Sequence, residues 1–532
     1  MCAIVGANFD FEYNNFLIHR GPDDYGEYKD KWVTLLHNRL AIIDLDNAKQ
    51  PFYFKDYVLI FNGEIYNYIE LKKELKEYDF KTHSDTEVLL YAYDKWGKEC
   101  LNKFNGDFAF CIYNKKTKKL FCARDRVGNK PFYYFWDGKR FIFASEIKAL
   151  KSYINEFNIQ KLGDTILFSI NDNDEYTIYK DIYNLKPSHY LEFNLKNKSL
   201  KTKKWYSVKK RIIKEPFDEF EFLIKDAVNI RLRSDVEVGG MLSGGIDSSI
   251  ISYFMKDKKF FSVSFKGEKI DESLYVEILK KKFNLNVKFI YPTFNKKILN
   301  KLINTQFDIF RSLSIYAQYD LFSKADVKVM LSGQGADELF GGYYHHIARF
   351  VAKNEKEFID RVKIYKSKAL EELKLGKKFL LPKELKLELL KEDNKKNLEE
   401  LREILNGYLP NYDLLLRKYN PNLKKALKDE VFSLNLPQLL RYEDRNAMAF
   451  SIENRTPFTD YRIIEFALNL PIGYKFKNGF SKYFLREFAK KFLPKEIVYR
   501  IDKIGFEAPD KKWFGNLFDF RIYLYNKLRK ML

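Results

Sequence analysis

Short apolar runs separated by turn signals dominate the first third of the chain, a pattern typical of strands. We predict strands at 58–61, 108–113 and 141–144, with Asn-Gly, Asp-Gly and Gly-Asn turns between elements. One helix is predicted after Ser84-Asp85-Thr86-Glu87, where Ser84 or Asp85 can cap the first turn. Residues 196–215 are polar and basic, which predicts a connection between two domains.

From about residue 216 onward, short apolar strands alternate with longer helical patterns, which predicts a parallel α/β sheet. The C-terminal half is predicted to be largely helical. Residues 354–405, rich in Lys, Glu and Leu, are predicted to form surface helices interrupted at Gly376 and Pro382. The predicted domains are therefore 2–195 and 216–532.

Composition supports a folded chain of two or three domains. The chain has 532 residues, of which 46% are hydrophobic and 31% charged, so it can bury sizeable cores. The chain contains no run of eighteen apolar residues, so we predict no membrane span. The start, Met1 to Gly6, lacks the basic region and cleavage site of a signal peptide. We therefore expect a cytoplasmic protein with no membrane partner.

The net charge has two interpretations. Lys and Arg number 94 and Asp and Glu number 73, which gives a formal charge of +21. A basic surface can bind a polyanion such as nucleic acid, but the excess is scattered apart from 196–214 and the tail at 527–530. We favour solvated lysine-rich faces and phosphate-bearing substrates, and we expect no nucleic-acid partner.

The four cysteines, at positions 2, 100, 111 and 122, form no CxxC and no Cys/His cluster with zinc-ligand spacing. We expect reduced thiols, with three of them used in packing. Cys2 differs, because removal of Met1 would place its thiol beside a free α-amine that titrates near neutral pH and can act as a base.

Asn62-Gly63 follows an apolar run, where spacing alone favours a hairpin turn. The alternative is that the Asn62 amide and the Gly63 N–H stabilise a developing oxyanion. The residues by themselves leave both interpretations open.

Two further loops follow apolar strands. The run 238–242 leads into a Gly/Ser-rich turn, Ser243 to Ser249, and then a helix, an arrangement that can bind phosphate although GxxxxGK[ST] is absent. The run 327–331 leads into Ser332 to Tyr343, which contains Gly turns and carboxylates. Two such strand ends suit ligand binding at the carboxyl edge of a parallel sheet.

Taken in order, the N-terminal segments resemble the glutaminase domain of class II (N-terminal nucleophile) glutamine amidotransferases, specifically that of glutamine-hydrolysing asparagine synthetases. The matching segments are 20–23, 38–44, 61–67, 84–87, 106–109 and 123–128. The resemblance implies an αββα sandwich in which Cys2 is the nucleophile that releases ammonia from glutamine. It also implies an oxyanion hole formed by Asn62 and Gly63, an α-carboxylate contact from Arg39, α-ammonium contacts from Glu64 and Asp85, and a loop carrying Arg20 over bound glutamine.

Residues 243–249 carry SGGxDSS, the signature of ATP pyrophosphatases, and 440–448 with 457–460 also resemble the synthetases. The resemblance implies a parallel-sheet ATP-pyrophosphatase domain with a helical C-terminal part that uses ATP and Mg²⁺. Asp247 and Asp337 would bind the Mg²⁺, and Lys503 matches the lysine that contacts the α-phosphate. The remaining implied ATP-binding residues are Leu242, Ser243, Gly244, Gly245, Ser248, Ser249, Val263, Ser332 and Gly333.

One departure concerns Gln334, because many family members have Glu at this position. A carboxylate could take a proton from attacking ammonia, whereas an amide cannot. Gln334 could still hydrogen-bond the substrate, with water, phosphate or another carboxylate as the proton acceptor. The leading prediction is ATP-dependent amidation of aspartate with ammonia from glutamine, through a β-aspartyl-adenylate, with release of AMP and pyrophosphate.

Two alternatives are weighed. A same-fold amidotransferase or cyclase would use a different carboxylate acceptor. An RNA-modifying enzyme that adenylates a base is disfavoured, because its thiolating versions need cysteines near the loop and no Cys follows Cys122. A homodimer is left open.

Overall fold

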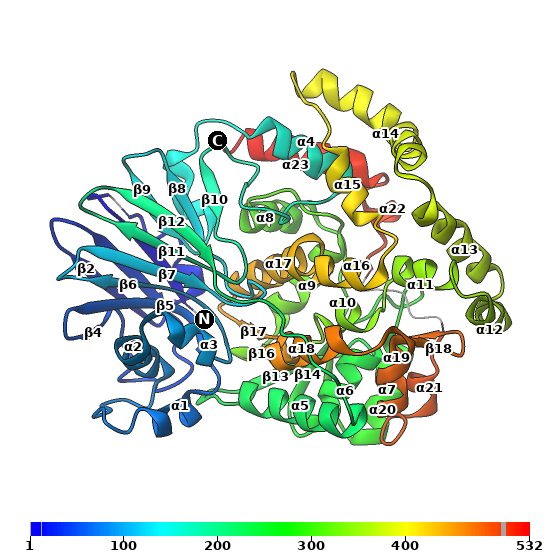
Figure 1. Ribbon diagram of the computed structural model, residues 1–532, viewed down its shortest axis with the longest axis horizontal. Helices are drawn as coiled ribbons and strands as arrows, with labels where there is room; N and C mark the ends of the chain where they lie inside the picture. Colours follow the sequence, from blue (N-terminus) through cyan, green and yellow to red (C-terminus); the bar gives the residue numbers. More distant parts are fainter. Residues whose placement is uncertain (1, 12, 502–506) are drawn as a thin grey trace.

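The computed structural model describes residues 2–11, 13–501 and 507–532. Figure 1 shows a two-sheet N-terminal domain, coloured blue to cyan, beside a second domain whose helices surround a parallel sheet, coloured green to red. Within these ranges, no helix combines the length and apolar character that crossing a bilayer requires.

Two six-stranded antiparallel sheets form the N-terminal domain. The first has the order β10 (Ile182–Asn184), β8 (Tyr133–Trp136), β9 (Phe141–Ala144), β1 (Ala3–Ala7), β3 (Thr34–Arg39) and β2 (Asp24–Lys29). The second has the order β12 (Ser199–Lys204), β11 (His189–Asn194), β7 (Lys119–Arg124), β6 (Gly106–Asn114), β5 (Tyr57–Ile65) and β4 (Phe52–Phe54). The strands predicted at 58–61, 108–113 and 141–144 are confirmed as parts of β5, β6 and β9.

Alternation along β1 shows how the layers form. Ile4 packs between the two sheets, against Val58 and Ile60 of β5, whereas Ala3 and Val5 face the opposite side. This is the two-residue period of a strand buried on both faces.

Helices cover both outer faces of the pair of sheets. Three lie against the second sheet, where Val88 and Leu89 pack on Phe61: α1 (Tyr68–Glu74), α2 (Asp85–Trp96) and α3 (Cys100–Lys103). On the other side, α4 (Ile159–Phe168) and helices of the second domain pack on the first sheet. Ser84 caps α2 by accepting from the Thr86 N–H, as predicted. The αββα sandwich is confirmed.

The predicted connection 196–215 differs from the structure in one respect. Strand β12, Ser199–Lys204, pairs with β11 along its whole length and extends the second sheet. Its lysines are exposed, as on many edge strands, so no apolar alternation revealed it. Residues 205–215, all of them described, contain no helix or strand and lead to the second domain.

The second domain is built on a five-stranded, all-parallel sheet. Its order is β15 (Asn286–Ile290), β14 (Lys259–Val263), β13 (Val238–Met241), β16 (Val329–Leu331) and β17 (Glu453–Arg455). The chain runs outward from β13 through β14 to β15, then resumes on the other side at β16. The strand order therefore reverses between β13 and β16, the place where open α/β sheets bind ligands.

Helices surround this sheet and form the C-terminal part of the chain. They are α5 (Pro216–Arg231), α6 (Ile246–Phe254), α7 (Ser273–Phe283), α8 (Lys296–Gln306), α9 (Ser314–Lys324), α10 (Ala336–Phe340), α11 (Tyr344–Val351), α12 (Glu355–Tyr365), α13 (Ser367–Leu380), α14 (Lys383–Ile404), α15 (Tyr412–Lys418), α16 (Leu423–Asp429), α17 (Leu436–Met448), α18 (Tyr461–Asn469), α19 (Ile472–Lys475), α20 (Tyr483–Ala489), α21 (Lys495–Val498), α22 (Asp510–Trp513) and α23 (Leu517–Arg529). A hairpin of β18 (Phe476–Lys477) and β19 (Phe480–Ser481) precedes α20.

The predicted interruption at Gly376 is wrong, whereas Pro382 does separate α13 from α14. Gly376 lies inside α13, where a Cβ atom would come within 2.2 Å of the Ala348 carbonyl oxygen of α11. The glycine therefore permits two helices to approach closely and does not end one.

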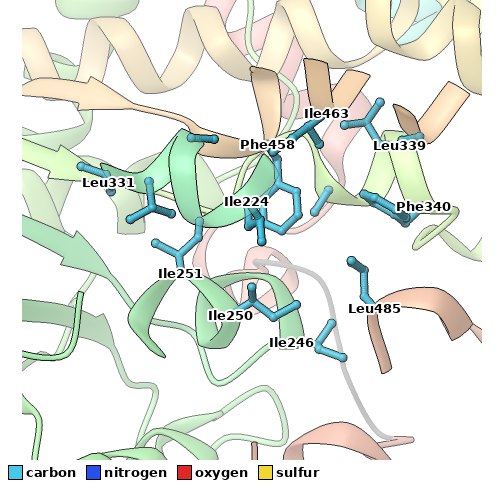
Figure 2. Packing of buried hydrophobic residues seen from close by; sticks show 14 of the residues in the cluster. Ile224, Ile246, Ile250, Ile251, Leu331, Leu339, Phe340, Phe458, Ile463 and Leu485 are labelled. Atoms are coloured by element: carbon cyan, nitrogen blue, oxygen red, sulfur yellow. The ribbon is translucent and has the colours of Figure 1, made fainter. Parts of the chain in front are cut away.

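The core of the second domain holds α6 in place. Figure 2 shows Ile246 and Ile250 of this helix packed in one cluster with Leu331 of β16, Phe340 of α10 and Leu485 of α20. Because α6 begins directly after the Gly/Ser-rich turn, this packing fixes the turn relative to the sheet edge.

Candidate active sites

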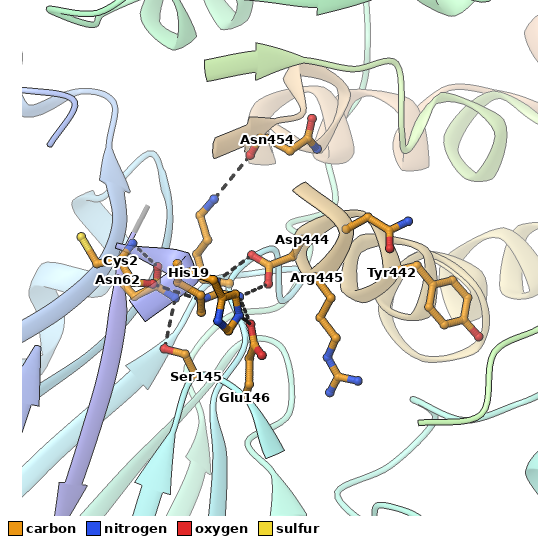
Figure 3. A network of polar contacts seen from close by, with 12 residues as sticks. Cys2, His19, Asn62, Ser145, Glu146, Tyr442, Asp444, Arg445 and Asn454 are labelled. Atoms are coloured by element: carbon orange, nitrogen blue, oxygen red, sulfur yellow. Dashed lines mark hydrogen bonds and ion pairs between the residues drawn. The ribbon is translucent and has the colours of Figure 1, made fainter. Parts of the chain in front are cut away.

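The first site gathers around Cys2. The Cys2 side chain is 7% exposed, and its N–H donates to Asn62 Oδ1 at 3.0 Å (Figure 3). The Asn62 amide nitrogen lies 3.5 Å from Ser145 Oγ, which also accepts from the Ile4 N–H at 3.0 Å. The sequence-predicted pair of Cys2 and Asn62 is therefore in direct contact.

Asn62 and Gly63 lie inside β5, paired with Ala109 and Phe108 of β6, so the hairpin interpretation is wrong. Gly63 has a φ of 147°, and a Cβ atom there would come within 2.1 Å of the Asp107 carbonyl oxygen. Only glycine fits this backbone conformation and this spacing. The position is thus specialised within the strand, and its part in an oxyanion hole stays a prediction.

The thiol is held protonated at rest. Burial raises the pKa of Cys2, and the Leu40 N–H and the charge of Arg39 only partly oppose this effect. A thiol in this setting needs a base before it can attack a carbonyl.

Two buried carboxyl groups interact with each other here, and one of them, Glu64, also acts on the thiol. Asp85 accepts from the Ile65 N–H at 2.8 Å, and burial raises its pKa to about 6. Burial also raises the pKa of Glu64, with the charges of Asp85 and Glu453 adding to the rise. Within the described residues, Glu64 Oε2 is buried without a hydrogen-bond partner. The pair is therefore suited to receive a cationic group such as an ammonium.

Arg39 is buried and donates to the carbonyl oxygens of Leu45 at 2.7 Å and Asp44 at 2.6 Å. These bonds fix the guanidinium close enough to the thiol to influence its pKa. Its contact with a substrate carboxylate stays a prediction.

Arg20 is fully buried between the domains. Its predicted place on a segment that covers bound glutamine stays a prediction. Its guanidinium donates to the Cys2 carbonyl oxygen at 3.2 Å, to Glu146 at 2.8 Å and to Asp444 of α17 at 2.8 Å. The ion pairs compensate the buried charge, so Arg20 joins the Cys2 backbone to a helix of the second domain.

The second site lies at the carboxyl ends of the neighbouring strands β13 and β16. Ser248 Oγ lies 3.2 Å from Ser243 Oγ, and Ser249 Oγ donates to the Gly245 carbonyl oxygen at 2.7 Å. Gly244 lies in the same turn, between β13 and α6. Leu242 follows β13 directly, and Val263 ends β14. The structure thus gathers hydroxyl and backbone groups at the start of α6, an arrangement suited to phosphate.

Asp247 and Asp337 converge from the two strand ends. Lys482 Nζ lies 2.5 Å from Asp247 Oδ2 and 2.5 Å from Asp337 Oδ1, and Lys482 is 4% exposed. Sequence reasoning missed this lysine, because its segment carries no motif that the residues alone reveal. Two carboxylates aimed at one cation form an oxygen donor set that suits Mg²⁺.

Other predicted residues lie around this edge. Ser332, Gly333 and Gln334 follow β16, and a Cβ atom on Gly333 would lie 3.2 Å from the Asp247 Cβ. Arg500, also missed from sequence, pairs with Glu272 at 2.7 Å and lies 3.4 Å from the Gly244 carbonyl oxygen. Lys503 lies outside the described residues.

Strand β17 connects the two sites. The Ser332 N–H donates to the Arg455 carbonyl oxygen at 2.9 Å. The Arg455 guanidinium lies 3.6 Å from Glu64 Oε1 and 2.6 Å from Glu453 Oε1. One buried residue therefore contacts the loop of the second site with its backbone and the acidic pair of the first with its side chain.

A third cluster lies away from both sites. His345 and His346 contact Glu430 at 2.7 and 2.8 Å, and their ligand atoms are close enough to surround a metal ion. The charge of Glu430, however, also acts on buried Arg349 and on partly buried Lys418. Because these cations oppose a further positive charge, we interpret the cluster as a structural ion-pair network.

Fold and sites together define a two-domain amidotransferase, in which a thiol-bearing sandwich is joined to a parallel-sheet domain. Residues 1–206 match the family model for a glutamine amidotransferase domain, and residues 219–530 match that for asparagine synthase. The chain belongs to the asparagine synthetase family.

Two relatives illustrate this similarity. The chain is 33% identical over 549 residues to glutamine-hydrolyzing asparagine synthetase 1 of Bacillus subtilis, which covers 95% of this chain and 84% of that protein. It is 30% identical over 535 residues to synthetase 3 of the same organism, covering 91% and 81%.

Proposed function

We propose that this chain makes asparagine from aspartate and ATP in the cytoplasm, with ammonia taken from glutamine. The observation that carries the proposal is the pairing of a buried thiol beside Asn62 and Gly63 with a Gly/Ser loop and two convergent aspartates at the sheet edge. The domain assignment, with a glutaminase at 2–204 and a synthetase at 216–532, is part of the same proposal.

In the first domain, loss of Met1 frees the Cys2 α-amine, which takes the thiol proton. The thiolate attacks the glutamine amide carbon, and the oxyanion receives hydrogen bonds from Asn62 and Gly63. Ammonia leaves, and water hydrolyses the glutamyl thioester to glutamate. Glu64 and Asp85 hold the substrate's α-ammonium, and Arg39 holds its α-carboxylate.

In the second domain, an aspartate β-carboxylate oxygen attacks the α-phosphorus of ATP, and pyrophosphate leaves. The hydroxyls of Ser243, Ser248 and Ser249 and the glycine N–H groups donate to phosphate oxygens. Asp247 and Asp337 would hold Mg²⁺, which neutralises phosphate charge. Lys482 would supply a fixed positive charge for the developing negative charge, and the resemblance assigns Lys503 to the α-phosphate.

Ammonia then attacks the acyl-adenylate carbon, and AMP leaves. AMP is a good leaving group, whereas a carboxylate oxygen is not, so ATP use makes the amidation feasible. Delivery of ammonia within the protein keeps it unprotonated.

The test is product formation by the purified chain. Glutamine, aspartate and MgATP should yield asparagine, glutamate, AMP and pyrophosphate in equal amounts. Formation of ADP and phosphate, or no pyrophosphate with any carboxylate, would contradict the proposal.

Gln334 favours one alternative, in which the acceptor is another carboxylate. Pyrophosphate release measured over a panel of amino acids, sugar acids and peptides decides between them. Turnover that does not require aspartate would support the alternative.

A further inference from the structure

Amide formation needs a proton acceptor near the second site. When ammonia attacks an acyl carbon, its nitrogen becomes positively charged and must lose a proton before AMP departs. The amide of Gln334 cannot take that proton. The residue that does so should be a buried base close to the loop that carries Gln334.

Glu443 meets this description. It lies on α17 and is 1% exposed, and its carboxyl group faces the side chains of Ser332 and Gln334. Burial raises the pKa of Glu443 to about 8, and these two neutral side chains only partly oppose the rise. A base of this strength suits proton transfer near neutral pH.

The other polar residues of α17 have partners elsewhere. Asp444 pairs with Arg20, and Arg445 donates to the Tyr133 hydroxyl at 2.9 Å. In contrast, the Glu443 carboxyl group faces only the neutral side chains of Ser332 and Gln334 in the loop after β16, and its contacts with them lack ordinary hydrogen-bond geometry. Burial of a carboxyl group with such weak partners is costly, so a packing role alone would be better served by an apolar residue.

We propose that Glu443 is the catalytic base of amide formation and replaces the carboxylate that Gln334 lacks. The C–N bond forms, the proton moves from nitrogen to a Glu443 oxygen, the C–O bond to AMP breaks, and the proton passes to solvent. The inference rests on the proposed function.

The test separates the two half-reactions. In Glu443→Gln, pyrophosphate release from aspartate and MgATP without a nitrogen donor should stay within about threefold of wild type. Asparagine formation with ammonium should fall about 100-fold or more, the usual contribution of a general base. Equal loss in both assays, or amide formation within threefold of wild type, overturns the inference.

A charge-swap variant tests the geometry. Gln334→Glu combined with Glu443→Gln keeps one carboxylate and one amide. The double variant should form the amide at least tenfold faster than Glu443→Gln alone. No recovery by the folded double variant counts against the inference. Absence of pyrophosphate release by wild type would instead refute the proposed function and is thus distinguishable.

Discussion

Asp85→Asn is expected to stabilise the free protein and to weaken glutamine binding. The Asp85 carboxylate is 4% exposed, and its charged form is costly until an ammonium arrives. Asparagine is similar in shape and keeps an oxygen for the Ile65 N–H. The substitution therefore removes the charge with little change in shape.

The magnitude follows from the pKa, which burial raises from 3.8 to about 6. The folded state binds the proton more tightly than the unfolded state, so stability is lost as pH rises through this range. The loss amounts to about 3 kcal/mol at pH 7, at about 1.4 kcal/mol per tenfold change in proton affinity. Asparagine stands in for the neutral carboxyl group, so the variant should gain up to about 3 kcal/mol at pH 7 and clearly less at pH 5.

Guanidinium unfolding followed by tryptophan fluorescence measures this gain. In glutamine-dependent assays, loss of a charged hydrogen bond worth about 1.5–3 kcal/mol should raise the KM for glutamine about 10- to 100-fold. Ammonium-dependent synthesis should not change.

Glu87→Gln is the matched control for Asp85→Asn. Glu87 is buried on the same helix, but Thr82 and Tyr91 satisfy its oxygens. Its loss should destabilise the protein without affecting the KM for glutamine. A less stable Asp85→Asn protein at pH 7, or an unchanged KM for glutamine, would refute the reasoning.

Three further expectations follow from the sites and the fold. Cys2→Ala should abolish glutamine-dependent but not ammonium-dependent asparagine formation, and loss of both would contradict separate sites. Asp337→Asn should raise the Mg²⁺ concentration for half-maximal pyrophosphate release about tenfold, because one of two convergent carboxylates is gone; an unchanged Mg²⁺ dependence would exclude a role in metal binding. Gly376→Ala should lower the free energy of unfolding by about 1–3 kcal/mol through the clash with Ala348, whereas Gly473→Ala, with open space around it, should not; equal effects in denaturant titrations would disprove the packing argument.

Local patterns in the sequence predicted β5, β6 and β9 of the first domain, β13 and β16 of the second, the capped helix α2 and the order of the two domains. They failed where a residue's role depends on a distant partner. Asn62-Gly63 is a residue pair typical of turns, yet its pairing with β6 keeps it in a strand. Glycine is typical of helix ends, yet Gly376 lies inside α13, where it lets α11 pack closely.

The residues of the candidate sites also divide into those that local motifs predicted and those that only the fold brings together. Asp247 and Asp337 were predicted because each lies in a short contiguous motif that resembles the synthetases and can be read directly from the sequence. Lys482 was missed because only the fold brings it, from 235 residues away, to Asp247. Glu443 lay inside a segment that resembles the synthetases, but its burial beside Gln334 is not visible in the sequence.

Arg455 gives the two proposed sites a shared buried residue. Its guanidinium lies beside the Glu64 carboxylate, and its carbonyl oxygen accepts from the Ser332 N–H. A cation bound by Glu64 would compete with the Arg455 guanidinium for the same carboxylate. Any coupling carried by this residue would be reciprocal, so that glutamine bound at one site and ATP at the other would change each other's affinity by an equal factor.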